Sequence, residues 1–193
     1  MKSYDKIVIK NTFFLYIMTG AKFVLPLIIT ACLTRRLGPE SYGVISYLTP
    51  VMGYFILLFD FGFDFSATKK ISQNRSNKEY IEKTIASVYT AKILLVPIGF
   101  IFLLILFFCV ELLREYFLLT VLYYISTAAQ IFIPDFLYRG LEKMEGITKR
   151  YILAKFITAV MIFVTVQDDR ELIIIPVAYL IGTVIAAVYT NHH

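Results

Sequence analysis

Tryptophan is absent from this 193-residue sequence, and cysteine and histidine occur twice each. Cys32 and Cys109 both lie inside apolar runs, so we expect small buried residues rather than disulfide partners or metal ligands. His192 and His193 are the last two residues, and we interpret them as a cloning remnant without a role. No nucleophile motif and no metal-binding aspartate cluster is found in the sequence. We therefore expect no enzyme activity, no metal and no cofactor.

Charge is also scarce, because charged residues make up 17% of the chain and hydrophobic residues 59%. Soluble chains are about 45–50% apolar. The apolar residues form long blocks instead of following an amphipathic pattern, which indicates membrane-spanning helices and the lipid bilayer as a partner. The net charge of +5 does not indicate a nucleic-acid partner, since most basic residues lie between the apolar blocks, where membrane topology accounts for them.

The blocks predict an all-α, polytopic membrane protein whose residues 1–193 form a single six-helix unit. The first block is too long for a signal-peptide core and lacks a small-residue cleavage site, so we expect a retained helix. Gly38-Pro39 separates the first helix from the second. The six transmembrane helices are expected at about residues 11–34, 42–65, 84–110, 116–138, 151–166 and 172–190.

The distribution of lysine and arginine predicts the direction of these helices. The segment before the first helix and the second and fourth loops hold 3, 5 and 4 of these residues, or 12 together. The first, third and fifth loops hold 2, 1 and 1, or 4 together. Positive residues are retained on the cytoplasmic side of a membrane. Both termini are therefore expected in the cytoplasm.

Three lysines fall inside the predicted helices, where a charge costs about 2.5–3.5 kcal/mol on insertion scales. Lys22 lies close to mid-membrane, and it either attracts a ligand into a lumen or pairs with a buried aspartate. Lys92 lies either at membrane level or at the cytoplasmic interface, because residues 93–110 are long enough to span alone. Lys155 must lie at membrane level, since residues 156–166 are too short to span. All three are candidate cationic lumen residues that bind substrate.

Four further charged residues are candidates because of their spacing. Asp60 and Asp64 are four residues apart, which places them on one face of the second predicted helix. Asp60 is a candidate for ion coupling or for an ion pair with a lysine, and Asp64 is either a similar candidate or an ordinary charged helix end. Asp135 and Arg139 are also four residues apart and are expected to form an ion pair at the cytoplasmic membrane surface.

Four short motifs, taken in order, carry a family resemblance. They are Arg36-Leu-Gly-Pro-Glu-Ser-Tyr-Gly43, Asp60-Phe-Gly62, Ala67-Thr-Lys-Lys-Ile-Ser72 and Phe136-Leu-Tyr-Arg-Gly-Leu-Glu-Lys-Met144. Together they resemble the Wzx-type flippases that export O-antigen or capsule repeat units, within the superfamily of multidrug, oligosaccharidyl-lipid and polysaccharide exporters. Arg139 departs from the family pattern, in which glutamine is common before Gly-Leu-Glu.

The resemblance implies a transporter that moves undecaprenyl-diphosphate-linked oligosaccharide across the bacterial inner membrane by alternating access. Family members have two six-helix lobes around a cavity that is often cationic, so the resemblance implies that this chain corresponds to the first lobe. A second lobe or a second copy of the chain would then complete the cavity, and a polysaccharide polymerase is a further candidate partner. The three membrane-level lysines suit a diphosphate or an acidic sugar.

Three alternatives remain beside the flippase interpretation. A multidrug or ion antiporter of the same superfamily would produce resistance phenotypes without a glycan defect. A truncated, non-functional relic of a flippase gene is compatible with the half length. A membrane enzyme acting on lipid-linked substrates has no support in the residues.

Overall fold

The computed structural model describes residues 2–168 and 171–191, with the side chains of 7–168 and 171–190. His192 and His193 lie outside this part of the chain. The described residues form an all-helical structure without strands, as the sequence predicts. In chain order the elements are α1 (Lys2–Arg36), α2 (Pro39–Asp60), α3 (Phe63–Gln73), α4 (Lys78–Cys109), α5 (Glu111–Glu115), α6 (Phe117–Ala128), the 3₁₀ helix η1 (Ala129–Phe132), α7 (Asp135–Gly140), α8 (Met144–Thr165) and α9 (Ile174–Asn191).

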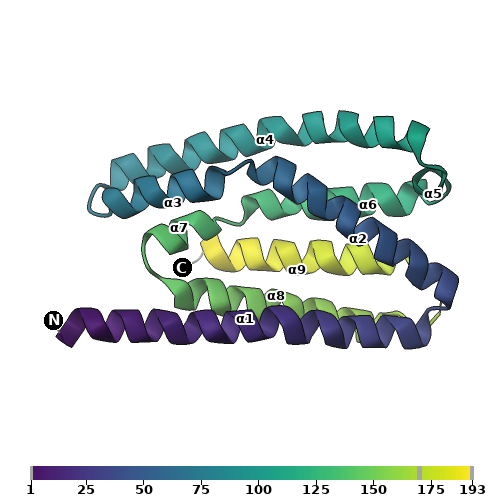
Figure 1. Cartoon of the computed structure of the whole chain (residues 1–193), viewed down its shortest axis with the longest axis horizontal. Coiled ribbons are helices and arrows are strands. Elements are labelled where there is room, and N and C mark those ends of the chain that lie inside the picture. The colour runs from purple at the N-terminus through teal and green to yellow at the C-terminus, as the bar shows by residue number, and fades with distance from the viewer. Residues whose placement is uncertain (1, 169–170, 192–193) are drawn as a thin grey trace.

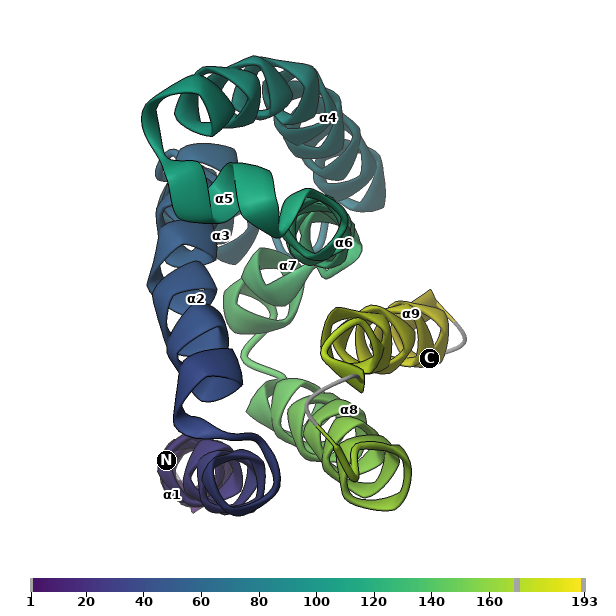
Figure 2. The ribbon, with the colours of Figure 1, turned by 90° about the vertical axis from the view of Figure 1, so that its right-hand side faces the viewer.

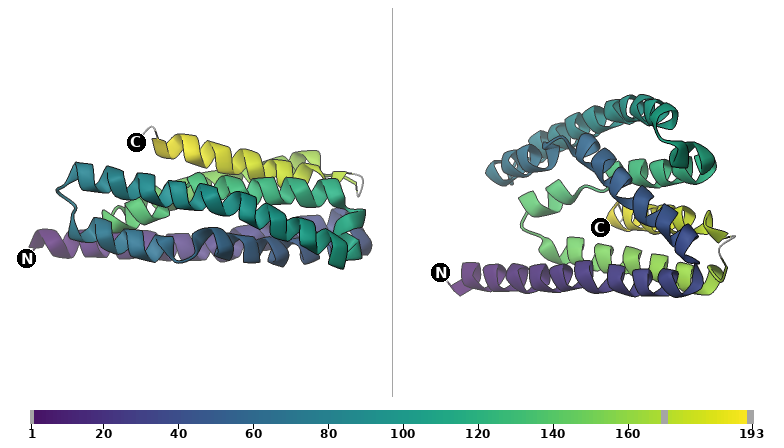
Figure 3. Two further views of the ribbon diagram at one scale, coloured as in Figure 1. Left: turned by 90° about the horizontal axis from the view of Figure 1, so that it is seen from above. Right: turned by 45° about the vertical axis from the view of Figure 1, so that its right-hand side comes forward.

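The long segments run alternately in opposite directions (Figures 1 and 3). Both ends of the described chain, the α3–α4 turn and the α7–α8 turn lie at one end of the bundle, whereas α5 and the α1–α2 turn lie at the other (Figure 1). Helix α8 packs against both α1 and α9, α9 also contacts α6, and α2 contacts α6 and α4. Seen end-on, the helices surround a central region into which α7 projects (Figure 2).

Four described stretches are long and apolar enough to cross a membrane: Ile7–Arg36, Pro39–Asp60, Lys78–Cys109 and Phe117–Gly140. A shorter apolar helix covers Ile174–Thr190. Helix α8 is as long as α2, but it carries Lys149, Arg150 and Lys155. These charges distinguish α8 from the four apolar stretches. Whether α8 can lie in a membrane depends on whether the charged side chains face lipid or the interior of the bundle.

The second predicted helix, over 42–65, differs from the structure because the chain breaks after Asp60. Phe61 and Gly62 both have positive φ values, 37° and 78°, and this left-handed conformation ends α2. Helix α3 then starts at Phe63, and most of the polar segment 66–83 is helical, since α4 begins at Lys78. Asp60 and Asp64 therefore lie on two helices, and the prediction that they share one face of a single helix is wrong.

The fourth predicted helix, over 116–138, is also divided. Helix α6 ends at Ala128, a 3₁₀ turn follows, and α7 starts only at Asp135. Pro134 has no N–H to donate, and it disfavours helical backbone at the residue before it. Ile133 is accordingly extended, with φ −94° and ψ 109°. This break turns the start of α7 toward the middle of the bundle (Figure 2).

Helices α8 and α9 approach closely at one glycine. A Cβ on Gly182 would lie 2.3 Å from Thr158 Oγ1 and 2.9 Å from the carbonyl oxygen of Ala154. Thr158 Oγ1 donates to the Ala154 carbonyl at 2.9 Å and lies 3.3 Å from the Ala178 carbonyl. The absent side chain thus lets the two helices pack almost backbone to backbone. This contact positions the wall of the cavity described below.

Candidate functional site

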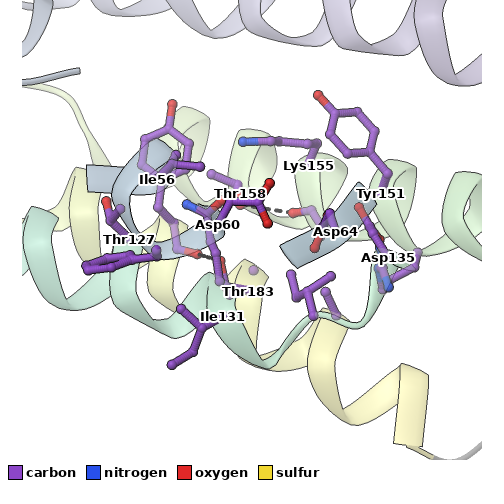
Figure 4. A pocket seen from close by; sticks show the side chains of 18 of the residues that line it. Ile56, Asp60, Asp64, Thr127, Ile131, Asp135, Tyr151, Lys155, Thr158 and Thr183 are labelled. Carbon is purple, nitrogen blue, oxygen red and sulfur yellow. Dashed lines mark hydrogen bonds and ion pairs between the residues drawn. The ribbon is translucent and has the colours of Figure 1, made fainter. Parts of the chain in front are cut away.

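A cavity of about 320 Å³ lies between α1, α2, α4, α6, α8 and α9, with residues of α3, η1 and α7 completing its wall. Four cationic and three acidic side chains line it. These are Lys22, Lys92, Arg150, Lys155, Asp60, Asp64 and Asp135. In Figure 4, Lys155 and Tyr151 of α8 lie on one side, Thr127 and Ile131 lie on the other, and Asp60 lies between them. The structure therefore gathers six of the seven candidate residues around one space, and Arg139 is not among its lining residues.

The three lysines come from the middle of their helices. Lys22 precedes the end of α1 by 14 residues, Lys92 precedes the end of α4 by 17, and Lys155 precedes the end of α8 by 10. At about 1.5 Å rise per residue, the three Cα atoms lie about 15–26 Å from those helix ends. The three helix ends are at the same end of the bundle (Figure 1). All three lysines therefore come from well inside their helices, and all three line the cavity.

Lys92 is buried and holds the two aspartates beside the α2–α3 break. Its Nζ lies 3.1 Å from Asp60 Oδ1 and 2.9 Å from Asp64 Oδ1. The Lys92 side chain is 7% exposed, whereas those of Asp60 and Asp64 are 32% and 20% exposed. The ammonium also lies 5.8 Å from the centroid of the Phe136 ring. A cation removed from solvent is here matched by two carboxylates that still face the cavity, and the group carries a net charge of −1 when both are ionised.

Arg150 forms the second ion pair, with Asp135. Its Nη2 contacts Asp135 Oδ1, and its Nη1 lies 3.4 Å from Thr190 Oγ1. The Arg150 side chain is 4% exposed. The expected pair between Asp135 and Arg139 is wrong: within residues 7–168 and 171–190 no ion pair joins them. The i, i+4 spacing was a valid reason for the prediction, but the start of α8 brings a buried guanidinium to the same carboxylate.

Lys22 and Lys155 have no carboxylate partner within the described part of the chain. Lys22 Nζ lies 5.8 Å from the centroid of the Tyr151 ring, and Lys155 Nζ lies 4.8 Å from that of Tyr179. Lys22 is exposed on the cavity side of α1, and Lys155 is half-buried. An aromatic face attracts a cation without neutralising its charge. These two ammonium groups therefore remain available to an anion that enters the cavity.

Hydroxyl and amide groups make up much of the remaining polar wall. Thr127, Thr158 and Thr183 line the cavity and donate to carbonyl oxygens of their own helices. Their oxygen atoms keep acceptor capacity, and Gln130 adds an amide. The site therefore combines unneutralised positive charge with hydroxyl groups and two tyrosine rings. This chemistry suits an anionic ligand that also carries many hydroxyl groups.

Ion pairs also join elements at the end of the bundle that holds both ends of the described chain (Figure 1). Glu145 lies 2.6 Å from both Lys10 and Lys149, which connects α1 to the start of α8. Arg75, in the α3–α4 turn, lies 2.6 Å from Glu142, between α7 and α8. The hydrogen bond from Arg75 lowers the pKa of the Glu142 carboxyl. These contacts connect α1, the α3–α4 turn and the segment between α7 and α8 at this end of the bundle.

Sequence reasoning missed Arg150, Tyr151 and Tyr179. Arg150 was counted among the loop cations, although it lies in the second turn of α8 and is buried. No local signal distinguishes it from its neighbour Lys149, whose side chain is 57% exposed. The sequence contains 14 tyrosines, and nothing local distinguishes the two that lie beneath the unpaired lysines.

Known proteins match most of this chain. A protein family described as "Polysaccharide biosynthesis protein" matches residues 8–191. The "Putative O-antigen transporter" of Escherichia coli (strain K12) is 28% identical over 162 residues, which cover 83% of this chain and 39% of the relative. A protein of the same name from Shigella dysenteriae is 26% identical over 175 residues, covering 85% and 41%. No solved structure matches.

The chain spans about two-fifths of the length of these two curated relatives. The matched region includes all the charged residues of the cavity. The resemblance drawn from the four motifs is confirmed at the level of the family. The chain belongs to the polysaccharide biosynthesis protein family.

Proposed function

We propose that this chain is a membrane-embedded lobe of a polysaccharide exporter that flips undecaprenyl-diphosphate-linked oligosaccharide across the bacterial inner membrane by alternating access. The observation that carries the proposal is the pair of unneutralised cations, Lys22 and Lys155, in a cavity bounded by apolar helices. A lysine at mid-membrane costs about 2.5–3.5 kcal/mol, so two without counter-charges indicate a function. The names of the two relatives, O-antigen transporters, support the same substrate class.

The proposed topology has six spans with both termini in the cytoplasm. Its support is the alternating direction of the helices and the position of both described ends at one end of the bundle (Figure 1). The basic residues of α3 and the α7–α8 segment lie at that same end, as positive charge does on the cytoplasmic side. Helix α8 serves as the fifth span because Arg150 and Lys155 face the cavity instead of lipid.

The proposed role of Lys22 and Lys155 is to bind the diphosphate. Coulomb attraction is several times stronger at the edge of a low-dielectric cavity than in water. The Tyr151 and Tyr179 rings, which already lie beside these lysines, would contact the sugar, and Thr183 would accept from its hydroxyl groups. Asp60 and Asp64 are proposed to couple transport to an ion gradient, since both carboxylates remain partly exposed to the cavity.

Additional protein is proposed to close the cavity. Only 11% of a hydrophobic window of α1 is buried, so much of the surface of this helix is left uncovered although α8 packs along it. The two relatives extend well beyond the matched length. A second six-helix lobe, or a second copy of this chain, would cover that surface. A polysaccharide polymerase that receives the exported units is a further proposed partner.

The test is export of surface polysaccharide in a strain that lacks its own flippase. The coding sequence that contains this chain, including any adjoining second half, would be expressed with Lys22→Met or Lys155→Met. Each change should lower export at least about tenfold, because it removes a charge-assisted contact to the diphosphate. Lys69→Met removes an exposed lysine outside the cavity and should leave export unchanged.

Three results would contradict the proposal. If the Lys22, Lys155 and Lys69 variants export equally well, the cavity lysines do not bind the substrate. Restored drug resistance with no surface polysaccharide, from the unaltered gene, would indicate the antiporter alternative. Failure of the unaltered gene in both assays would indicate the relic, and sequencing beyond codon 193 would show whether a second half follows.

A further inference from the structure

A second groove lies away from the central cavity, between α3 and the first turns of α4. Its volume is about 390 Å³. Buried Ala67 of α3 and Val88 of α4 form its floor, with Phe63 beside them. Lys70 and Lys83 are exposed and line it from opposite helices. The groove therefore has an apolar floor and two cations on its walls.

The groove is at the level of lipid headgroups. A hydrocarbon core about 30 Å thick takes about 20 helical residues, which on α4 extends from Cys109 back to about Tyr89. Val88 then lies at the edge of the hydrocarbon, and Lys83 lies within about 10 Å outside it. The headgroup region is about 5–8 Å thick on each side. The apolar floor thus borders the acyl region, and Lys83 borders the phosphates.

Several polar groups of this groove remain able to bind a ligand. Lys70 has no ion-pair or hydrogen-bond partner through its ammonium group among the described residues, and neither has the hydroxyl of Tyr80. Lys83 pairs with Glu79 at 2.7 Å, but both side chains are about three-quarters exposed. An exposed i, i+4 pair contributes little stability, so Lys83 can also bind a second anion. Ser87 and Ser66 add hydroxyl oxygens.

We propose that this groove binds the phosphate of an anionic phospholipid of the cytoplasmic leaflet, with Lys70 and Lys83 contacting the phosphate and an acyl chain lying over Phe63 and Val88. Basic pockets between membrane helices on the cytoplasmic side are suited to anionic headgroups. A free phosphate shares the chemistry of the two lysines but gains nothing from the apolar floor. The proposed site is separate from the transport cavity, because the two share no lining residue.

The experiment is native mass spectrometry of the purified chain in detergent, titrated with short-chain phosphatidylglycerol, phosphatidylcholine or inorganic phosphate. The test variant is Lys70→Gln with Lys83→Gln. The matched control is Lys69→Gln with Lys78→Gln, which removes the same charge from the same two helices but from exposed positions outside the groove. Helical content by circular dichroism verifies that both variants fold.

Phosphatidylglycerol should bind the unaltered chain and the control with similar affinity, and the test variant at least about tenfold more weakly. Phosphatidylcholine has the same phosphodiester but a neutral headgroup, so its binding should differ less between the test variant and the other two proteins. An equal loss in test and control variants would overturn the proposal by showing a non-specific effect of charge. Inorganic phosphate binding as tightly as phosphatidylglycerol would overturn the lipid as the ligand. If the test variant does not fold, Lys70→Gln alone should show a smaller loss in the same direction, and no loss would contradict the site.

Discussion

The cavity contains two kinds of cation, and they differ in how their charge is balanced. Lys92 and Arg150 are buried, and each contacts at least one carboxylate. Lys22 and Lys155 are more accessible, and each lies over a tyrosine ring instead. A cation removed from solvent needs a counter-charge, whereas one that reaches a polar cavity can stay unneutralised. The comparison therefore supports a stabilising role for the first pair and the binding role proposed for the second pair.

The largest loss of unfolding free energy is expected when the Arg150–Asp135 ion pair is broken. Asp135→Asn keeps the shape of the side chain but leaves a guanidinium that is 4% exposed without its carboxylate. Removing one partner of a buried ion pair typically costs about 3–5 kcal/mol of unfolding free energy. Denaturant unfolding in detergent micelles measures this loss. Adding Arg150→Met to Asp135→Asn should recover most of it, and an Asp135→Asn protein as stable as the original would contradict the assignment.

A smaller loss is expected when Lys92 is replaced by methionine. Asp60 and Asp64 would then face each other without a cation, but both carboxylates keep access to the cavity. The cost should be about 2–3 kcal/mol, below the range for fully buried charges. The same unfolding measurement applies. The triple variant with Asp60→Asn and Asp64→Asn should regain stability, and no recovery would show that Lys92 does not act through these aspartates.

These two ion pairs also show what the sequence could predict and what it could not. Counting residues along apolar blocks places Lys22 and Lys155 at membrane level, because helical rise is constant, but it leaves Lys92 either at membrane level or at the interface. Their partners depend on how each helix is rotated and which helix lies beside it. The pattern could not supply this information, so a sequence-local partner, Arg139, was assigned to Asp135 in place of Arg150.

The all-helical fold with long apolar helices was predictable, but two internal breaks were not. An apolar block continues through Phe61 and through Ile133, so hydropathy gives no sign of interruption. The signals that remained were local: Gly62 permits the positive φ that ends α2, and Pro134 disfavours a helix before it. The first break leaves Asp60 and Asp64 on different helices, and the second turns Asp135 inward, so both shape the cavity.

A moderate loss of unfolding free energy is expected for a substitution at Gly182. This residue lies where α8 and α9 pack closely, and these helices carry Lys155, one of the two lysines without a carboxylate partner, and Tyr179. Lys155 comes from α8 and Tyr179 from α9, so their contact depends on close packing of these helices. Gly182→Ala places a Cβ 2.3 Å from Thr158 Oγ1, and overpacking of this kind costs about 1–3 kcal/mol. Unfolding free energy is again the measurement. Gly20→Ala in α1 is the control, since a Cβ there meets nothing within 4 Å and should be neutral or stabilising.

The smallest effect on stability is expected where the effect on export is largest. Lys22→Met and Lys155→Met remove cations that have no carboxylate partner, so no acid is left unpaired. Each loses a cation–π contact of about 0.5–2 kcal/mol and gains from no longer holding a charge at mid-membrane. The unfolding free energy should change by less than about 1 kcal/mol. If either variant is instead destabilised as much as Lys92→Met, that lysine holds the fold, and its loss of export would no longer indicate substrate binding.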